Sequence, residues 1–158
     1  MKLPKTIQMD VSDTQVFEHA ARPGEWAVTG SFSFSDVNIE DLNRKQRLAF
    51  KSGWVGIPSG GYSTLVQVTS ATQSEFDDVV LQLAQLFVQA YGAPDIDQAT
   101  PVARDEVLYV SSLCEYDEGT LLSLSRELKE DGIREIVRPV NLDKNSTQAI
   151  KIWELIEE

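Results

Sequence analysis

His19 is the only histidine in the chain, and histidine is the side chain most often used for general acid–base catalysis. A catalytic histidine also needs a second polar group that orients its ring. Glu18 and Glu25 are near in the sequence, but a strand over this segment would place Glu18 on the opposite face from His19. The pattern therefore favours a structural or surface histidine and predicts no catalytic residue.

Other residues that could carry covalent or metal chemistry lack the spacing that such chemistry needs. Cys114 precedes an acidic cluster at residues 115–118, and nearby negative charge raises the pKa of a thiol, so we expect a core cysteine. Neither this cluster nor the pair Asp95 and Asp97 matches a calcium-binding loop, and no cysteine and histidine set exists for zinc. We expect neither a metal site nor a cofactor.

The segment Pro58–Thr64 contains two adjacent glycines but lacks the lysine of a P-loop and the spacing of a nucleophile elbow. We expect a β-turn between two strands here. Exposed backbone N–H groups of this loop, beside Trp54 and Tyr62, could hold a small ligand or a peptide.

A basic cluster is the least expected feature of the sequence. Its four members, which lie within eight consecutive positions of an otherwise acidic chain, are Arg44, Lys45, Arg47 and Lys51. One interpretation is a solvated helix face whose charges pair with Glu40 and Asp41. The other is a docking surface for an acidic protein partner or for the acidic surface of a second copy of this chain.

The charge balance excludes some classes of partner. The 158 residues include 14 Lys and Arg against 25 Asp and Glu, a net charge of −11, and residues 73–131 alone carry 13 acids and 3 bases. Such a surface repels nucleic acid and anionic membranes. We expect no signal peptide, and no apolar stretch reaches the ~20 residues that a membrane span requires. A single cysteine excludes an internal disulfide and suits the cytoplasm.

Hydrophobic periodicity predicts several strands and one helix in the first half of the chain. We expect short extended segments at residues 5–10 and 15–20, with Val16–Ala20 pairing as a hairpin with an alternating strand over Trp26–Ser35. Asn38 is expected to cap a helix that runs to about Phe50. Further strands are expected at Gly53–Ile57 and Ser63–Ser70.

The strongest helix signal lies at residues 73–91. Thr72 and Glu75 form a capping box, apolar residues recur at helical spacing, and Gly92 and Pro94 end the pattern. Ala93–Pro101 reads as a connector. The following 102–115 segment favours a helix over a strand.

The C-terminal part is more ambiguous. For residues 120–140 a hairpin turning at Asp131 and Gly132 is favoured over a helix that would end at Gly132. A last helix is expected after Ser146 or Thr147.

Six short motifs spread along the chain form a recognisable pattern. They are Met1-Lys2-Leu3, Asp10-x-Ser12-Asp13-Thr14-x-Val16-Phe17, Gly24-Glu25-Trp26-Ala27-Val28-x-Gly30-x-Phe32, Ala49-Phe50-x-Ser52-Gly53-x-x-Gly56, Ser63-Thr64-Leu65-Val66 and Gly119-Thr120-Leu121-Leu122. In these motifs the chain resembles a family of small bacterial proteins of unknown function. The resemblance implies a single compact domain and assigns no catalytic residue.

Together these patterns predict one α+β domain over residues 1–158, with a mostly antiparallel sheet packed against a long central helix at 73–91. The expected function is that of a non-enzymatic interaction protein of the bacterial cytoplasm, which binds through the basic cluster together with Trp54 and Tyr62. The alternative is a small-molecule-binding protein or small enzyme whose pocket between sheet and helix includes His19, Ser59 and Arg126.

Overall fold

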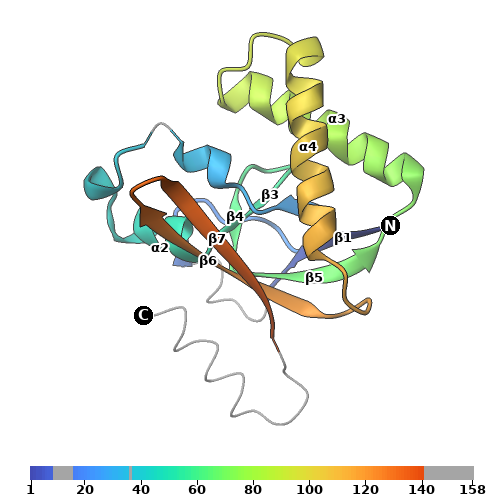
Figure 1. The fold of residues 1–158 in the computed structure, drawn as a ribbon, viewed down its shortest axis with the longest axis horizontal. Coiled ribbons are helices and arrows are strands. Elements are labelled where there is room, and N and C mark those ends of the chain that lie inside the picture. The colour runs from blue at the N-terminus through green and yellow to red at the C-terminus, as the bar shows by residue number, and fades with distance from the viewer. Residues whose placement is uncertain (9–15, 36, 141–158) are drawn as a thin grey trace.

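Two antiparallel sheets form the β part of the molecule (Figure 1). The computed structural model describes residues 1–8, 16–35 and 37–140. The larger sheet has the order β1-β5-β6-β7, with bounds β1 (Lys2–Ile7), β5 (Leu65–Ser70), β6 (Leu121–Lys129) and β7 (Gly132–Val140). The smaller sheet has the order β2-β3-β4, with bounds β2 (Ala27–Val28), β3 (Trp54–Gly56) and β4 (Tyr62–Ser63).

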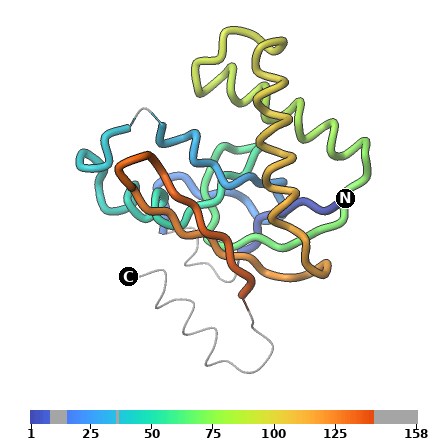
Figure 2. Tube along the Cα trace, viewed as in Figure 1, coloured from blue at the N-terminus to red at the C-terminus, as the bar shows by residue number. Residues whose placement is uncertain are grey.

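The helical elements lie at two places around the sheets. They are the 3-10 turns η1 (Ser31–Phe34) and η2 (Ile39–Asp41) and the helices α2 (Arg44–Ser52), α3 (Gln73–Ala90) and α4 (Ile96–Leu113). Helices α3 and α4 pack together at one end, whereas α2 lies beside the long β6–β7 hairpin at the other (Figure 2). The predicted α+β class with antiparallel sheets is confirmed. None of the described helices has both the length and the apolar character of a membrane-spanning segment.

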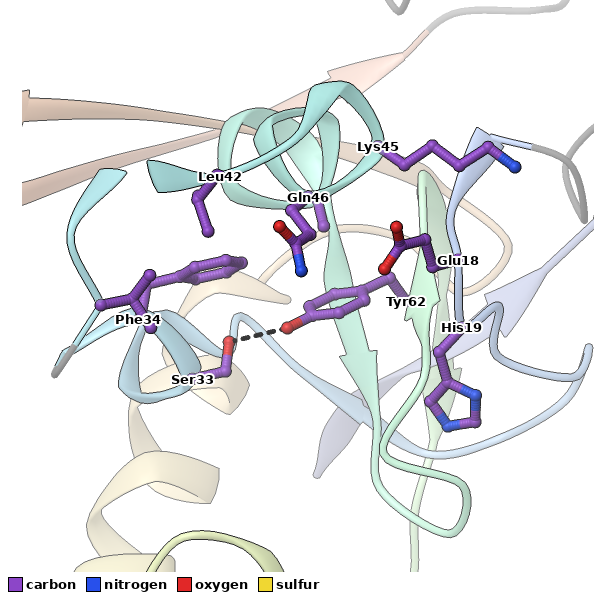
Figure 3. A pocket seen from close by; sticks show the side chains of 10 residues that line it. Glu18, His19, Ser33, Phe34, Leu42, Lys45, Gln46 and Tyr62 are labelled. Carbon is purple, nitrogen blue, oxygen red and sulfur yellow. Dashed lines mark hydrogen bonds between the residues drawn. The ribbon is translucent and has the colours of Figure 1, made fainter. Parts of the chain in front are cut away.

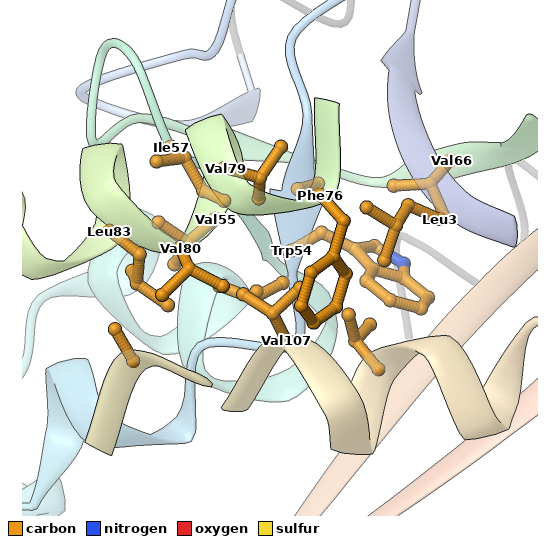
Figure 4. Packing of buried hydrophobic residues seen from close by; sticks show 14 of the residues in the cluster. Leu3, Trp54, Val55, Ile57, Val66, Phe76, Val79, Val80, Leu83 and Val107 are labelled. Carbon is orange, nitrogen blue, oxygen red and sulfur yellow. The ribbon is translucent and has the colours of Figure 1, made fainter. Parts of the chain in front are cut away.

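Helix α3 forms where the sequence predicts it. The Thr72 hydroxyl accepts from the backbone N–H of Glu75, and the Glu75 carboxylate accepts from the N–H of Thr72. Gly92, at a φ of 78°, follows the end of the helix. The apolar face of α3 packs against α4 and the sheets, with Leu83 fully buried and Val107 opposite (Figure 4). Because α3 and α4 share this core, neither is central alone.

Helix α4 confirms the predicted helix but begins earlier, so the expected connector Ala93–Pro101 is wrong. The Asp95 carboxylate caps the helix by accepting from the N–H of Gln98. Pro101 stands inside the helix and removes one backbone donor. Ala99, two residues before the proline, is buried, as are Ala103 and Val107 farther along the same helix. This burial holds the N-terminal turns of α4 in place despite the proline.

The favoured hairpin over residues 120–140 is also confirmed, with a turn one residue earlier than expected. Lys129 pairs with Gly132, which leaves Glu130 and Asp131 at the centre of the turn. The inner face of the hairpin carries Leu122 and Leu124, both buried. The expected helix after Ser146 or Thr147 lies outside the described residues.

The N-terminal third departs from the predicted hairpin. Residues 16–20 form no strand apart from a bridge of Ala20 with Tyr62. The alternating pattern of Trp26–Ser35 yields only the two-residue β2, because Gly30 adopts a φ of 88° and the chain then coils into η1. A Cβ at Gly30 would lie 2.3 Å from a methyl carbon of Val55, so the chain packs too closely there for any other residue.

The expected helix start at Asn38 is wrong as well. Asn38 caps only η2, and α2 begins after Asn43, whose side chain forms a reciprocal capping box with Gln46. Two asparagines therefore cap two separate short elements, and α2 is shorter than predicted at its N-terminal end.

Candidate functional site

The predicted basic cluster lies on the solvent side of α2. The side chains of Arg44, Lys45, Arg47 and Lys51, which we call the basic face, are all exposed. Arg47 donates to the backbone carbonyl of Glu40 at 3.2 Å. Within the described ranges, no carboxylate lies within 4.0 Å of the side-chain nitrogens of Arg44, Lys45 or Arg47. The expected ionic pairing with Glu40 and Asp41 is thus not found for these three.

Helix α2 presents this face on a fixed support. Its inner side buries Ala49 and Phe50. The Asn43 side chain, which caps the helix, also donates to Glu18 at 2.6 Å and so links the start of α2 to the segment at residues 18–19. The carbonyls at the other end of the helix receive hydrogen bonds from Arg126.

Arg126 is a buried residue whose guanidinium bonds to other parts of the chain. Its guanidinium donates to the carbonyls of Ala49 (3.1 Å), Phe50 (2.9 Å) and Thr29 and to the Ser31 hydroxyl (2.9 Å). Its side chain has no exposed area, and Nε lies 3.5 Å from a carboxylate oxygen of Glu135. Burial lowers its pKa, which Glu135 partly counteracts. A cation at the C-terminal end of α2 also suits the helix dipole.

The sequence did not single out Glu135, which pairs with Arg126, or Glu106, which interacts with Glu135. Glu135 accepts from the Thr29 hydroxyl at 3.3 Å and supplies the countercharge of the buried guanidinium. Burial raises the pKa of Glu106 on α4, and the nearby carboxylates of Glu135 and Asp105 raise it further. The register of the β6–β7 hairpin puts Arg126 and Glu135 directly opposite each other. This pair could therefore be identified only once the register was known.

A cavity of about 230 Å³ lies between the segment at residues 18–19, η1 and α2 (Figure 3). Its lining residues are Glu18, His19, Ser33, Phe34, Val37, Leu42, Lys45, Gln46, Ala49 and Tyr62. The Tyr62 hydroxyl donates to Ser33 at 3.2 Å, and the Tyr62 and Phe34 rings are 5.9 Å apart between centroids. Lys45 belongs to both the cavity lining and the basic face, so the two features are continuous.

Of the three residues proposed for a pocket, only His19 lines this cavity. Its Nε2 is 2.9 Å from the backbone carbonyl of Ser59, and Figure 3 shows the ring turned away from the Tyr62 hydroxyl. Ser59 instead bonds Glu25, which accepts from the Ser59 N–H (2.7 Å) and hydroxyl (2.9 Å). Glu25 is itself buried, so Ser59 and Glu25 fix the turn at residues 58–61.

The two aromatic residues proposed for the binding surface have different positions. Trp54 has an exposed fraction of 0 % and lies in the main core, so it cannot face a partner. Tyr62 is half-buried and forms one wall of the cavity. In the sequence, Trp54 and Tyr62 flank the same loop, but in the structure the Trp54 side chain on β3 lies in the main hydrophobic core.

Residues with the potential for metal or thiol chemistry are not assembled. Across the described part of the chain, no group of three or more His, Cys, Asp or Glu side chains is placed to hold a metal ion. Cys114 is buried, and this burial raises its pKa to about 12. The thiol is therefore protonated at neutral pH and behaves as a core side chain.

A protein-family model described as a family of unknown function (DUF6505) matches residues 1–157. Neither the curated proteins nor the solved structures include a significant match to the chain.

Proposed function

Because the chain belongs to the DUF6505 family, whose description names no activity, we propose its function from the geometry of α2. We propose that this is a non-enzymatic interaction protein whose basic face binds an acidic segment of a partner protein. The observation that carries the proposal is the exposure of four basic side chains on one fixed helix, in a chain whose net charge is −11.

The distribution of charge supports an acidic partner. Residues 73–113, which include α3 and α4, contain seven acids and one base, and these two helices lie at the other end of the molecule from α2 (Figure 1). Facing patches of opposite charge increase the rate and the specificity of association. An acidic segment is therefore attracted by the basic face and repelled by the end of the molecule that carries α3 and α4.

The setting that we propose is the bacterial cytoplasm. The resemblance to small bacterial proteins supports the bacterial origin. The single, buried Cys114 is compatible with a reducing compartment.

The cavity favours a second candidate, the binding of a small molecule. His19, Lys45 and Glu18 supply polar groups to its lining. This candidate ranks lower because Ser59 and Arg126, the other proposed pocket residues, bond to the protein itself. Small-molecule pockets also usually measure roughly 300–1,000 Å³, more than this cavity.

The test compares the wild type with the double variant Arg44→Glu and Arg47→Glu. A labelled glutamate-rich peptide is titrated with each protein, and binding is followed by fluorescence anisotropy at low salt. We expect the variant to bind at least about tenfold more weakly, and about 1 M salt to abolish wild-type binding, because the Debye length is then roughly 3 Å. Glutamate in the first turn of α2 is compatible with the helix dipole, so we expect the variant to fold.

A matched control changes net charge by the same amount elsewhere. Arg104 and Arg138 are exposed residues of α4 and β7, and the variant Arg104→Glu with Arg138→Glu should retain wild-type affinity. Equal weakening by the two double variants, or no binding by the wild type, contradicts the proposal. Analytical sedimentation of the protein alone tests whether the partner is a second copy of this chain. In that case the Arg44→Glu and Arg47→Glu variant, but not the control variant, would lose self-association.

A further inference from the structure

The cavity beside α2 has the properties of a site for one side chain of a bound peptide. We propose that it receives an aromatic side chain, tryptophan or tyrosine, of an acidic segment bound to the basic face. This inference rests on the proposed function of that face. It adds the residue type that anchors the partner.

The walls of the cavity are aromatic and already held in place. The Phe34 ring packs edge-on against Phe50, with centroids 5.3 Å apart, and is only 6 % exposed. The Tyr62 ring is fixed by its hydrogen bond to Ser33 and by a contact with Phe17 at 5.9 Å. Aromatic rings attract one another in tilted and edge-to-face arrangements, so a third ring would find two oriented partners.

The size of the cavity suits a side chain. Its volume of about 230 Å³ lies below the roughly 300–1,000 Å³ of pockets that enclose whole drug-sized ligands. Buried tryptophan and tyrosine side chains in well-packed pockets contribute much of the affinity of protein interfaces. A single inserted ring would therefore dominate binding by an otherwise charged segment.

The polar groups around the cavity select the neighbours of that ring. Lys45 stands where the cavity meets the basic face, so carboxylates next to the inserted residue would reach Lys45 and Arg44. Glu18, which is held by Asn43, offers a carboxylate to an indole N–H or a phenol O–H. This acceptor favours tryptophan or tyrosine over phenylalanine at the inserted position.

The test uses glutamate-rich peptides that are identical except for a central tryptophan, phenylalanine or alanine. On the wild-type protein we expect the tryptophan peptide to bind at least about tenfold more tightly than the alanine peptide, with the phenylalanine peptide between them. Equal affinities for tryptophan and alanine would overturn the inference. This comparison needs no protein variant, so misfolding cannot affect it.

A pair of variants at Gln46 locates the effect. Figure 3 shows the Gln46 side chain extending into the cavity, and its carbonyl oxygen accepts from the N–H of Asn43. Gln46→Trp and Gln46→Ala both remove this capping bond, but only tryptophan fills the cavity. The advantage of the tryptophan peptide should disappear in Gln46→Trp and persist in Gln46→Ala. Its persistence in both variants would place the ring elsewhere and overturn the inference.

The two proposals fail in different ways. Loss of the basic face in the Arg44→Glu and Arg47→Glu variant should weaken all three peptides by the same factor and leave their order unchanged. If the alanine peptide binds the basic face but tryptophan adds nothing, the proposed function stands and the anchor is wrong. If no acidic peptide responds to the charge variant, the proposed function itself fails.

Discussion

The Nη1 atom of Arg126 lies 2.9 Å from the carbonyl oxygen of Phe50, although 76 positions separate the two residues. This bond joins β6 to the last turn of α2, whose opposite side carries the basic face. The same nitrogen donates to Ala49 at 3.1 Å. The buried guanidinium of Arg126 therefore helps to fix the position of α2 and, with it, of the exposed basic face.

Replacement of Arg126 by methionine should lower the free energy of unfolding by about 3–5 kcal/mol, because the largely buried carboxylate of Glu135 would lose its countercharge and the carbonyls of α2 their donor. Urea denaturation measures the change. The exposed Arg104→Met should shift stability by no more than about 0.5 kcal/mol. A similar, small effect of both substitutions would contradict the structural role of Arg126.

Alanine substitutions at Gly24 and Gly30 separate the effect of backbone strain alone, at Gly24, from that of strain combined with a steric clash, at Gly30. Both have positive φ, 88° and 82°, but a Cβ at Gly24 meets no atom within 4 Å, whereas one at Gly30 meets Val55. We expect Gly24→Ala to cost about 1–2 kcal/mol and Gly30→Ala about 1–3 kcal/mol more. Thermal or urea unfolding of the two variants tests this order, and equal losses would contradict the packing at Gly30.

Glu106 should make the protein less stable as pH rises. Its pKa is raised above the unfolded-state value of 4.5 by burial first and by neighbouring carboxylates second. The folded state thus binds more protons than the unfolded state between the two pKa values, and stability falls as pH increases through that window. Glu106→Gln should therefore be more stable than the wild type at about pH 7, and this gain should shrink as pH falls from the folded-state pKa toward 4.5 and be lost below that value.

The control for this pH effect is Glu130→Gln, at the exposed turn of the β6–β7 hairpin. Urea unfolding over a series of pH values should give the same pH slope for Glu130→Gln and the wild type. A flattened slope in Glu130→Gln, or an unchanged one in Glu106→Gln, would be evidence against the assignment.

Cys114 should be almost unreactive in the folded protein, since its thiol is buried and its pKa is raised to about 12. A chromogenic disulfide reagent measures the rate of modification. We expect slow modification in buffer and rapid modification in denaturing urea, with the native rate following the population of unfolded chains. Fast modification without unfolding would mean that the thiol is accessible.

Elements governed by neighbouring residues could be predicted from the sequence. The capping box of Thr72 and Glu75, the apolar spacing of α3 and the β6–β7 turn all depend on groups a few positions apart. Asn38 and Asn43 are both competent caps by residue type, but only Asn43 forms the reciprocal capping box, with Gln46, that starts α2, whereas Asn38 caps η2.

The candidate site depended on the sequence and the tertiary structure in different ways. The basic face follows from residue type and helical spacing, so the sequence alone determined that four cations share a short segment. The cavity combines His19, Phe34, Lys45 and Tyr62 from separate elements, and Arg126 finds its partners 76 to 97 positions away. Only the tertiary structure decided these contacts and the burial of Trp54. The reason is that the groups surrounding a buried polar or aromatic side chain come from segments far apart in the sequence, whose approach no local pattern predicts.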